Sequence, residues 1–217
     1  MKQKHCYIYN KVKSMANTVM LFVYWGFLGT TLLCLCSCDA ENSISTRYPC
    51  KFIFYTNLHP GTDIETALNG NGIYAMVSAQ KGNGTWIVYT SLNDGKNVTN
   101  HITLTTAKEN YADYNYIGAG KNAKDVTKNG FILGTTNFSG HVAWDRQCPN
   151  CINQYGGTNY PLEWTGNRQS VICDKCKRVY SLETGAITSG GQGKTDEALM
   201  RYQVSYGGIG SILKVGN

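Results

Sequence analysis

Two closely spaced pairs of cysteines constrain this chain more than any other feature of its sequence. Cys148-Pro-Asn-Cys151 and Cys173-Asp-Lys-Cys176 are C-x2-C motifs separated by 21 residues, just outside the usual window for paired C-x2-C zinc motifs. Two thiols three positions apart on a tight turn point to one side, and their backbone N–H groups aim at the sulfurs. Two such turns facing each other close a tetrahedral four-sulfur site. We therefore predict that Cys148, Cys151, Cys173 and Cys176 bind one shared metal.

The alternative is two disulfides or free thiols, because an exported chain can meet an oxidising compartment. A bond within a C-x2-C motif is typical of redox proteins of the thioredoxin type, in which the motif opens a helix. The residues after Cys151 (Ile-Asn-Gln-Tyr-Gly-Gly) indicate turns, and residues 177–180 indicate a strand. The expected redox context is therefore missing, and the shared metal is the favoured interpretation.

The N-terminus has the pattern of an export signal. Residues 1–37 contain four lysines and no acidic side chain, and an apolar run without charge begins at Met20. The run is close to the length of a membrane span, so a retained anchor is the competing interpretation. Leu35-Cys36-Ser37-Cys38 resembles the lipobox of bacterial lipoproteins, in which the final Cys is acylated and becomes the mature N-terminus. This resemblance implies lipidation at Cys38 and a stable anchor in a bacterial membrane.

The same resemblance implies a location in the cell envelope, on the periplasmic or the surface face. The acidic residues Asp39 and Glu41 follow the lipobox directly and resemble the surface-export signal of some Gram-negative lipoproteins, which favours the outer membrane over the inner one. We assign residues 1–37 to a lipoprotein signal peptide, 38–48 to a polar tether and 49–217 to a folded domain.

We predict that the folded domain, residues 49–217, is all-β. Runs rich in Val, Ile, Thr and aromatic residues alternate with Asn and Gly, a pattern typical of short strands joined by tight turns. The sequence predicts strands at 51–56, 72–78, 85–91, 101–106, 131–134 and 141–144, with hairpin turns near 81–84 and 137–140. Residues 64–68 fit either a helical turn or a strand, and 111–122 indicate a loop. An antiparallel sandwich or barrel is the expected architecture.

Several segments around the cysteines resemble the cluster-binding core of the Rieske family. They are an Ala-containing strand into a Cys-Pro loop, a second Cys loop followed by Tyr180-Ser-Leu-Glu-Thr-Gly185, and the late strands Leu199-Met-Arg-Tyr-Gln-Val204 and Ile212-Leu-Lys-Val215. The resemblance covers about residues 131–217 and implies a Rieske-like domain with 49–56 as a first strand. Residues of about 60–128 would then be an elaboration.

The ligand set departs from that family. Rieske sites use two Cys and two His, whereas Asn150 stands at the first His position and Cys176 replaces the second. A His-ligated cluster is therefore excluded by the ligand count. Four thiolates suit Zn(II), a mononuclear iron or an all-cysteine 2Fe-2S cluster. Zinc is favoured because it fills closed four-thiolate sites without assembly machinery, while family descent supports iron.

Charge and motifs exclude other functions. Residues 38–217 carry 16 basic against 14 acidic side chains, and only Lys175, Lys177 and Arg178 cluster, which we interpret as the solvated rim of a turn. This pattern indicates no nucleic acid partner. Residues 193–195 (Gly-Lys-Thr) match the last part of the nucleotide-binding P-loop motif, but Thr188 stands where that motif needs its first Gly. No nucleotide is therefore expected. A flexible loop over the cysteines, at 186–197, is the better interpretation.

Two hypotheses remain open. The first is a lipid-tethered domain that presents one metal centre, as a structural zinc site or as an iron centre for electron transfer, with a redox or envelope protein as partner. The second is a structural or interaction lipoprotein, in which the cysteines only staple loops and the 60–128 segment binds a partner. His59, His101 and His141 are scattered along the mature chain, and no catalytic motif is present, so we do not expect an enzyme.

Overall fold

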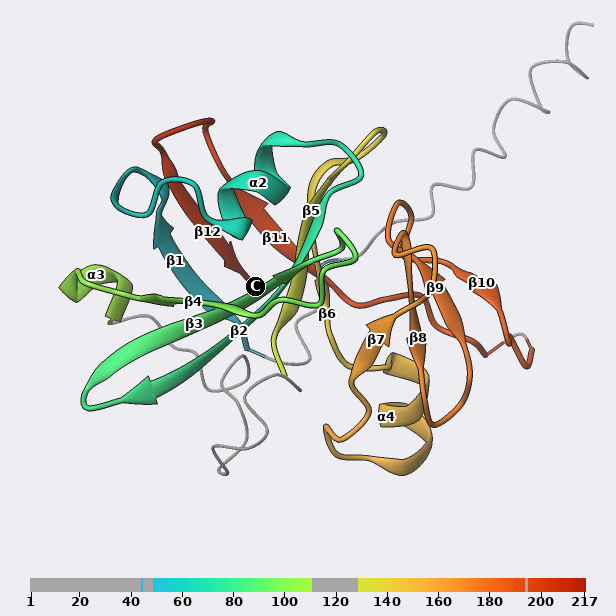
Figure 1. Ribbon diagram of the computed structural model, residues 1–217. Coiled ribbons are helices and arrows are strands. Elements are labelled where there is room, and N and C mark those ends of the chain that lie inside the picture. The colour runs from blue at the N-terminus through green and yellow to red at the C-terminus, as the bar shows by residue number, and fades with distance from the viewer. Residues whose placement is uncertain (1–43, 45–48, 111–128, 194) are drawn as a thin grey trace, which may run out of the picture. The chain divides into compact units, whose positions relative to one another are not determined.

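The computed structural model describes Ile44 and residues 49–110, 129–193 and 195–217, which belong to one compact unit of residues 42–217. Two antiparallel sheets and a few short helices make up this part (Figure 1). The elements are β1 (Lys51–Tyr55), η1 (Thr56–Leu58), α2 (Asp63–Asn69), β2 (Tyr74–Gly82), β3 (Thr85–Leu92), β4 (Asn100–Thr103), α3 (Ala107–Asn110), β5 (Phe131–Thr136), β6 (Gly140–Asp145), α4 (Pro149–Tyr155), β7 (Leu162–Trp164), β8 (Ser170–Cys173), β9 (Val179–Ser181), β10 (Ile187–Ser189), β11 (Arg201–Ser205) and β12 (Ile212–Gly216).

The larger sheet has eight strands in the order β1-β12-β11-β6-β5-β2-β3-β4. Its hairpins form where the sequence predicts them. Asn83 and Gly84, for example, both have positive φ between β2 and β3, as a two-residue turn of the I′ type requires. The first strand, β1, pairs with the last strand, β12. Strands β2, β3 and β4 extend this same sheet from β5, so residues 74–103 belong to the same sheet as β5 and β6.

Both faces of the larger sheet are buried at its centre. Alternate residues of a strand point to opposite faces, and β2, β5 and β6 bury apolar residues on each. One face packs against α2, and Thr135 Oγ1 donates to the carbonyls of Ala67 and Leu68 at the end of that helix. This first core contains Ala75, Val77, Phe131, Leu133 and Ala143. The other face contributes Tyr74, Met76, Ile132, Val142 and Trp144 to a second core.

The smaller sheet covers this second core. Its strands run in the order β10-β9-β8-β7, and its buried residues Leu162, Val171, Tyr180 and Leu182 pack with the second core. The Trp144 indole Nε1–H donates to the Leu182 carbonyl at 2.9 Å. The turn after β9 lies so close that a Cβ on Gly185, which has φ +74°, would come within 2.9 Å of the Trp144 ring. The buried Trp144 ring and Gly185, which has no side chain to clash with it, are therefore one close contact between the two sheets.

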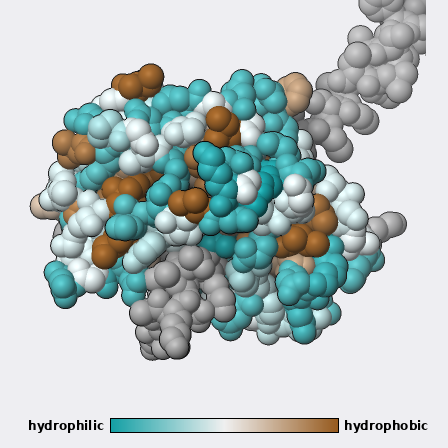
Figure 2. Space-filling model, viewed as in Figure 1, coloured by the Kyte–Doolittle hydropathy of each residue, from teal (hydrophilic) through white to brown (hydrophobic). Residues whose placement is uncertain are grey.

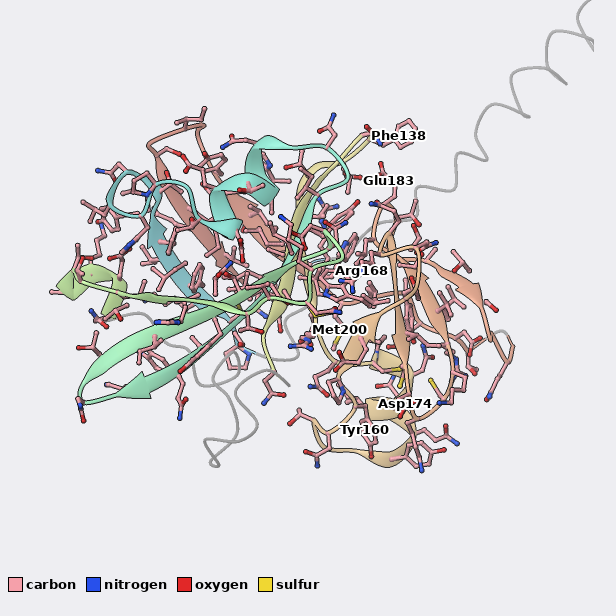
Figure 3. All side chains as sticks on the ribbon, in the orientation of Figure 1. Phe138, Tyr160, Arg168, Asp174, Glu183 and Met200 are labelled. Atoms are coloured by element: carbon pink, nitrogen blue, oxygen red, sulfur yellow. The ribbon has the colours of Figure 1, made fainter. Side chains whose placement is uncertain are left out.

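A further link joins the two sheets at the tip of the β5–β6 hairpin. The backbone N–H groups of Asn137 and Phe138, at the tip of the β5–β6 hairpin, donate to the carboxylate of Glu183, in the turn between β9 and β10. Phe138 and Glu183 are labelled side by side in Figure 3. The Phe138 ring itself is exposed. On the viewed face, hydrophobic residues occur in several separate groups among hydrophilic ones (Figure 2).

The observed strands agree with the predicted all-β class, and residues 63–69 resolve the ambiguity at 64–68 as a helix, α2. One local prediction is wrong: the residues after Cys151 form part of the helix α4 rather than turns, so the first C-x2-C motif does open a helix. Within the described part of the chain, every helix is too short or too polar to span a bilayer. The signal segment, Cys38 and the predicted loop at 111–122 lie outside the described residues.

Candidate metal centre

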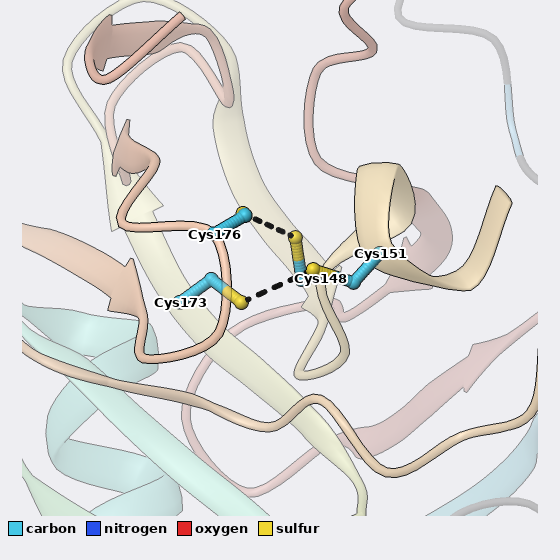
Figure 4. Close-up of side chains that lie close together, drawn as sticks. All are labelled: Cys148, Cys151, Cys173 and Cys176. Carbon is cyan, nitrogen blue, oxygen red and sulfur yellow. Dashed lines mark hydrogen bonds between the residues drawn. The ribbon is translucent and has the colours of Figure 1, made fainter. Parts of the chain in front are cut away.

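The four cysteines lie at one end of the smaller sheet, on two segments that face each other (Figure 4). Cys148 is the N-cap residue of α4 and Cys151 lies in its first turn, while Cys173 ends β8 and Cys176 lies in the turn toward β9. Pro149 at the first helical position suits the helix start, since a proline there loses no helical hydrogen bond. The structure therefore brings together all four residues that the sequence predicts as ligands.

The sulfur atoms form one compact cluster. The Sγ atoms of Cys148 and Cys176 are 3.6 Å apart, and so are those of Cys151 and Cys173. All four lie within 4.8 Å of one another. A metal–sulfur bond of about 2.3 Å gives a regular four-sulfur tetrahedron an edge of about 3.8 Å. The observed separations match a site for a single ion.

A two-iron cluster fits these separations less well. In a 2Fe-2S centre each iron takes two of the four protein thiolates. The width of the sulfide-bridged iron pair then separates one pair of cysteines from the other. All the sulfurs here lie within 4.8 Å of one another, so the two pairs of cysteines would have to move apart to admit a second iron. These separations would therefore suit one tetrahedral ion better than a two-iron cluster.

Each C-x2-C turn, which we call a knuckle, is shaped by hydrogen bonds of its own backbone; the first knuckle is residues 148–151 and the second is residues 173–176. The N–H of Cys151 points at the sulfur of Cys148, and the N–H of Cys176 points at the sulfur of Cys173. The second knuckle is closed by two bonds: Lys177 N–H donates to the Cys173 carbonyl, and Cys173 N–H donates to the Arg178 carbonyl. Lys177 takes a positive φ of 60° to make this turn. These N–H groups favour thiolates over thiols, as metal binding requires.

The sulfurs share protons unequally. Hydrogen bonding from Cys148, ahead of the N–H of Cys176 and the other thiols, lowers the pKa of Cys173 to about 5. Burial, followed by the neighbouring Cys176 and Cys173, raises the pKa of Cys151 to about 12. The pKa of Cys148 is also raised, first by its hydrogen bond to Cys173 and then by burial. Cys173 therefore ionises before Cys148 and Cys151, and each further thiolate is disfavoured because negative sulfurs at this spacing repel one another without a cation.

The site is largely closed to solvent. Cys148, Cys151 and Cys173 are fully buried, and only Cys176 is partly exposed. The sulfurs pack with Val171, Leu182 and the other members of the second core. A closed site of four thiolates is the arrangement of structural zinc centres, whereas catalytic zinc keeps an open position for water.

The sequence does not predict the roles of two polar residues next to the sulfurs. The Tyr180 hydroxyl is 3.2 Å from the Cys148 sulfur, and it accepts a hydrogen bond from Asn150 Nδ2 at 2.9 Å. Asn150 also exchanges two bonds with the backbone of Glu197: its Nδ2 donates to the carbonyl, and its Oδ1 accepts from the N–H. These contacts join residues 30 and 47 positions apart in the chain, which no local spacing reveals.

The prediction of a flexible loop over the cysteines, at 186–197, is in part wrong, because Ile187–Ser189 form the strand β10. The rest of this segment contacts both knuckles. We call residues 190–193 and 195–197 the covering loop. It bonds to the first knuckle through Asn150, and Gly190 packs against the backbone of Lys177 and Arg178 at the second. The interpretation of Arg178 as a solvated rim residue is wrong, because its side chain is only 6% exposed and pairs with Asp196 of the covering loop at 2.8 Å. Lys175 and Lys177 are exposed as expected.

The histidines lie elsewhere. His141 Nδ1 is 3.0 Å from Thr135 Oγ1, and its ring packs against Tyr206. His59 pairs with the buried Glu109, and His101 is an exposed residue of β4. Cys50 is buried beside the Val215 carbonyl. In the described ranges, no second cluster of three or more His, Cys, Asp or Glu residues is suited to a metal.

No model of a known protein family matches this chain, and neither does any curated protein or solved structure. The functional argument therefore rests on the four cysteines and their surroundings. None of the described cysteines takes part in a disulfide.

Proposed function

We propose that this chain is a lipid-anchored envelope protein whose β-domain carries one tetrahedral metal ion on Cys148, Cys151, Cys173 and Cys176, with zinc as the ion. One observation carries the proposal: the four sulfur atoms, from two segments separated by 21 residues, lie within 4.8 Å of one another. A disulfide needs only two sulfurs, about 2.05 Å apart, and would not require all four to converge.

The burial of the site supports zinc. Three of the four cysteines are buried in the second core, and four thiolates complete a tetrahedral coordination sphere, which leaves no ligand position for water or substrate. Zinc in such a site contributes directly to folding. A single iron fits the same four thiolates and would make the domain an electron carrier, with the partly exposed Cys176 as the sulfur nearest to a partner.

The Rieske-like character of the domain is part of the proposal. It is supported by two cysteine-bearing turns at the end of a small sheet, and by a larger sheet in which the first strand pairs with the last. The lipid anchor is supported by the lipobox that ends at Cys38 and by the basic and apolar residues before it.

Metal content tests the central proposal. We expect the full-length protein, purified in detergent without added metal, to contain one zinc ion per chain and to be colourless. Visible absorption with one iron per chain would assign the same site to iron, and two irons would show that the site widens. Cys173→Ser should lose most of the metal because three thiolates remain. Cys50→Ser, at a buried cysteine outside the cluster, is the matched control and should retain it. A metal-free wild-type protein would overturn the proposal.

Cell fractionation tests the anchor independently. Cys38→Ser removes the acylated residue, so the protein should leave the membrane fraction, or accumulate with its signal uncleaved. Cys36→Ser changes a neighbouring cysteine and should remain membrane-bound and cleaved. Metabolic labelling with a radioactive fatty acid separates the two interpretations, because a retained anchor would hold the chain in the membrane without label.

A further inference from the structure

Arg178 is a buried cation at the edge of the four-sulfur cluster. It lies two residues after Cys176, at the start of the return into β9, and its side chain is 6% exposed. The neighbouring Lys175 and Lys177 extend into solvent, and Lys177 is paired with the exposed Asp174. Of the three basic residues at the second knuckle, only Arg178 is directed inward.

Only one of the three guanidinium nitrogens of Arg178 donates hydrogen bonds to the covering loop. Its Nη2 donates to Asp196 Oδ1 at 2.8 Å and to Gln192 Oε1 at 3.3 Å. Its Nε and Nη1 atoms are buried and have no hydrogen-bond partner. The sulfur of Cys176 lies beside the guanidinium: the hydrogen bond with Asp196 raises the pKa of Arg178 most, and the contact with Cys176 adds to it.

A buried arginine with unused donors needs a reason. Leaving a buried N–H group without an acceptor is costly, more so on a charged side chain. Arginine has five donors in a rigid fork, so it can serve two acceptors on different sides. A thiolate at Cys176 would be a third acceptor, in addition to Asp196 and Gln192.

Metal binding supplies that thiolate, because a cysteine loses its proton when it binds the ion. Four thiolates around a divalent ion carry a net charge of −2 in a largely buried environment, where an uncompensated charge is disfavoured. N–H groups directed at metal-bound sulfurs offset this charge and tune the centre. The backbone already provides one such N–H to Cys148 and one to Cys173. Cys176, the partly exposed sulfur, has the guanidinium beside it.

We propose that Arg178 is a positioning residue that couples the covering loop to the metal. One of its two unpartnered groups, Nε–H or Nη1–H, donates to the metal-bound thiolate of Cys176, while its Nη2–H holds Asp196 so that the loop stays closed over the site. This inference rests on the proposed function, because it needs a metal on the four cysteines. Asn150 forms a second attachment of the same loop, to the first knuckle, so the loop is fastened at both knuckles when the site is filled.

Metal release measures this coupling. The zinc-loaded full-length protein is mixed with the chromogenic chelator 4-(2-pyridylazo)resorcinol, and the rate of zinc transfer is followed. Arg178→Gln should release zinc roughly tenfold to hundredfold faster, the usual effect of losing an outer partner of a metal ligand. Arg178→Lys should fall between it and the wild type, since it keeps the charge but loses the fork. Lys177→Gln removes an exposed positive charge one residue away and should match the wild type.

A spectroscopic readout separates this role from general stability. Cobalt in place of zinc gives sulfur-to-cobalt charge-transfer bands, whose energy falls when a donor to a thiolate is removed. Arg178→Gln should shift these bands to lower energy. Asp196→Asn, which loosens the loop but leaves the guanidinium near Cys176, should release zinc faster with the bands in place.

Equal release rates for Arg178→Gln and Lys177→Gln, with unshifted cobalt bands, would overturn the inference. If Arg178→Gln does not fold, Arg178→Lys and Asp196→Asn decide the question, and wild-type rates for both would count against it. A wild-type protein that binds neither zinc nor cobalt would instead refute the proposed function.

Discussion

Tyr180 is the residue where the metal centre, the core and the covering loop meet. Its ring is fully buried in the second core, and its hydroxyl lies between the Cys148 sulfur and the Asn150 amide. Burial is the main cause that raises the pKa of Tyr180, so the hydroxyl remains protonated and can donate to sulfur. A phenylalanine would keep the packing and remove only this polar link.

Tyr180→Phe should therefore lower the free energy of unfolding by about 1–3 kcal/mol, because Asn150 Nδ2 loses a buried acceptor. Urea unfolding of the metal-loaded protein measures the change. Tyr155→Phe is the control: Tyr155 lies on α4 with more than half of its surface exposed, so its change should stay within about 0.5 kcal/mol. An equal effect of the two substitutions would show that the Tyr180 hydroxyl does not contribute to the free energy of unfolding.

At the residue scale, the sequence predicts the ligands but not their surroundings. The four cysteines are recognisable because C-x2-C spacing directly reflects the geometry of a tight turn. Asn150, Tyr180 and Asp196 act through contacts with residues 18 to 47 positions away. No local pattern encodes such contacts. The burial of Arg178 cannot be predicted for the same reason, since its partner Asp196 lies on a loop distant in sequence.

At the element scale, strands and hairpins were predictable because their signals are local. Asn-Gly and similar pairs mark turns that need positive φ, and β-branched runs mark strands. Helix α4 was missed although it has ordinary boundary signals, with Pro149 at its first position and Gly156 at its end. Seven residues are too few for a helical apolar period to stand out, and the helix depends on tertiary packing against the smaller sheet.

The turn between β9 and β10 gives a sharp test of element packing. Gly185→Ala would place a Cβ about 2.9 Å from the Trp144 ring, at φ +74°. Left-handed backbone costs a non-glycine residue roughly 1–2 kcal/mol, and overpacking adds roughly 1–3 kcal/mol. Gly210→Ala has a similar φ of +79° but open space around it, so it should show only the backbone cost. The difference in unfolding free energy between the two variants isolates the contact with Trp144, and a difference near zero would argue against close packing there.

At the scale of the whole molecule, the two sheets depend on different interactions. The larger sheet has its own core on the face covered by α2, built from aromatic and aliphatic residues of eight strands. The smaller sheet has four strands of three or four residues each, shorter than the roughly five or six residues of a typical strand. Its buried side chains pack against one face of the larger sheet and around the sulfurs.

This division predicts how the protein responds to loss of its metal. Structural zinc on four thiolates contributes on the order of 10 kcal/mol to folding, which is comparable to the whole stability of a typical domain. Removing it leaves four close, largely buried sulfurs without a cation, so β7–β10, α4 and the covering loop should open first. Amide hydrogen exchange after chelation should show lost protection there, while β2, β5 and β6 remain protected by the first core. Reloading with zinc should restore the pattern, which controls for irreversible damage by the chelator. Simultaneous loss of protection in both sheets would instead mean that the metal stabilises the entire unit and that the first core cannot hold the larger sheet alone.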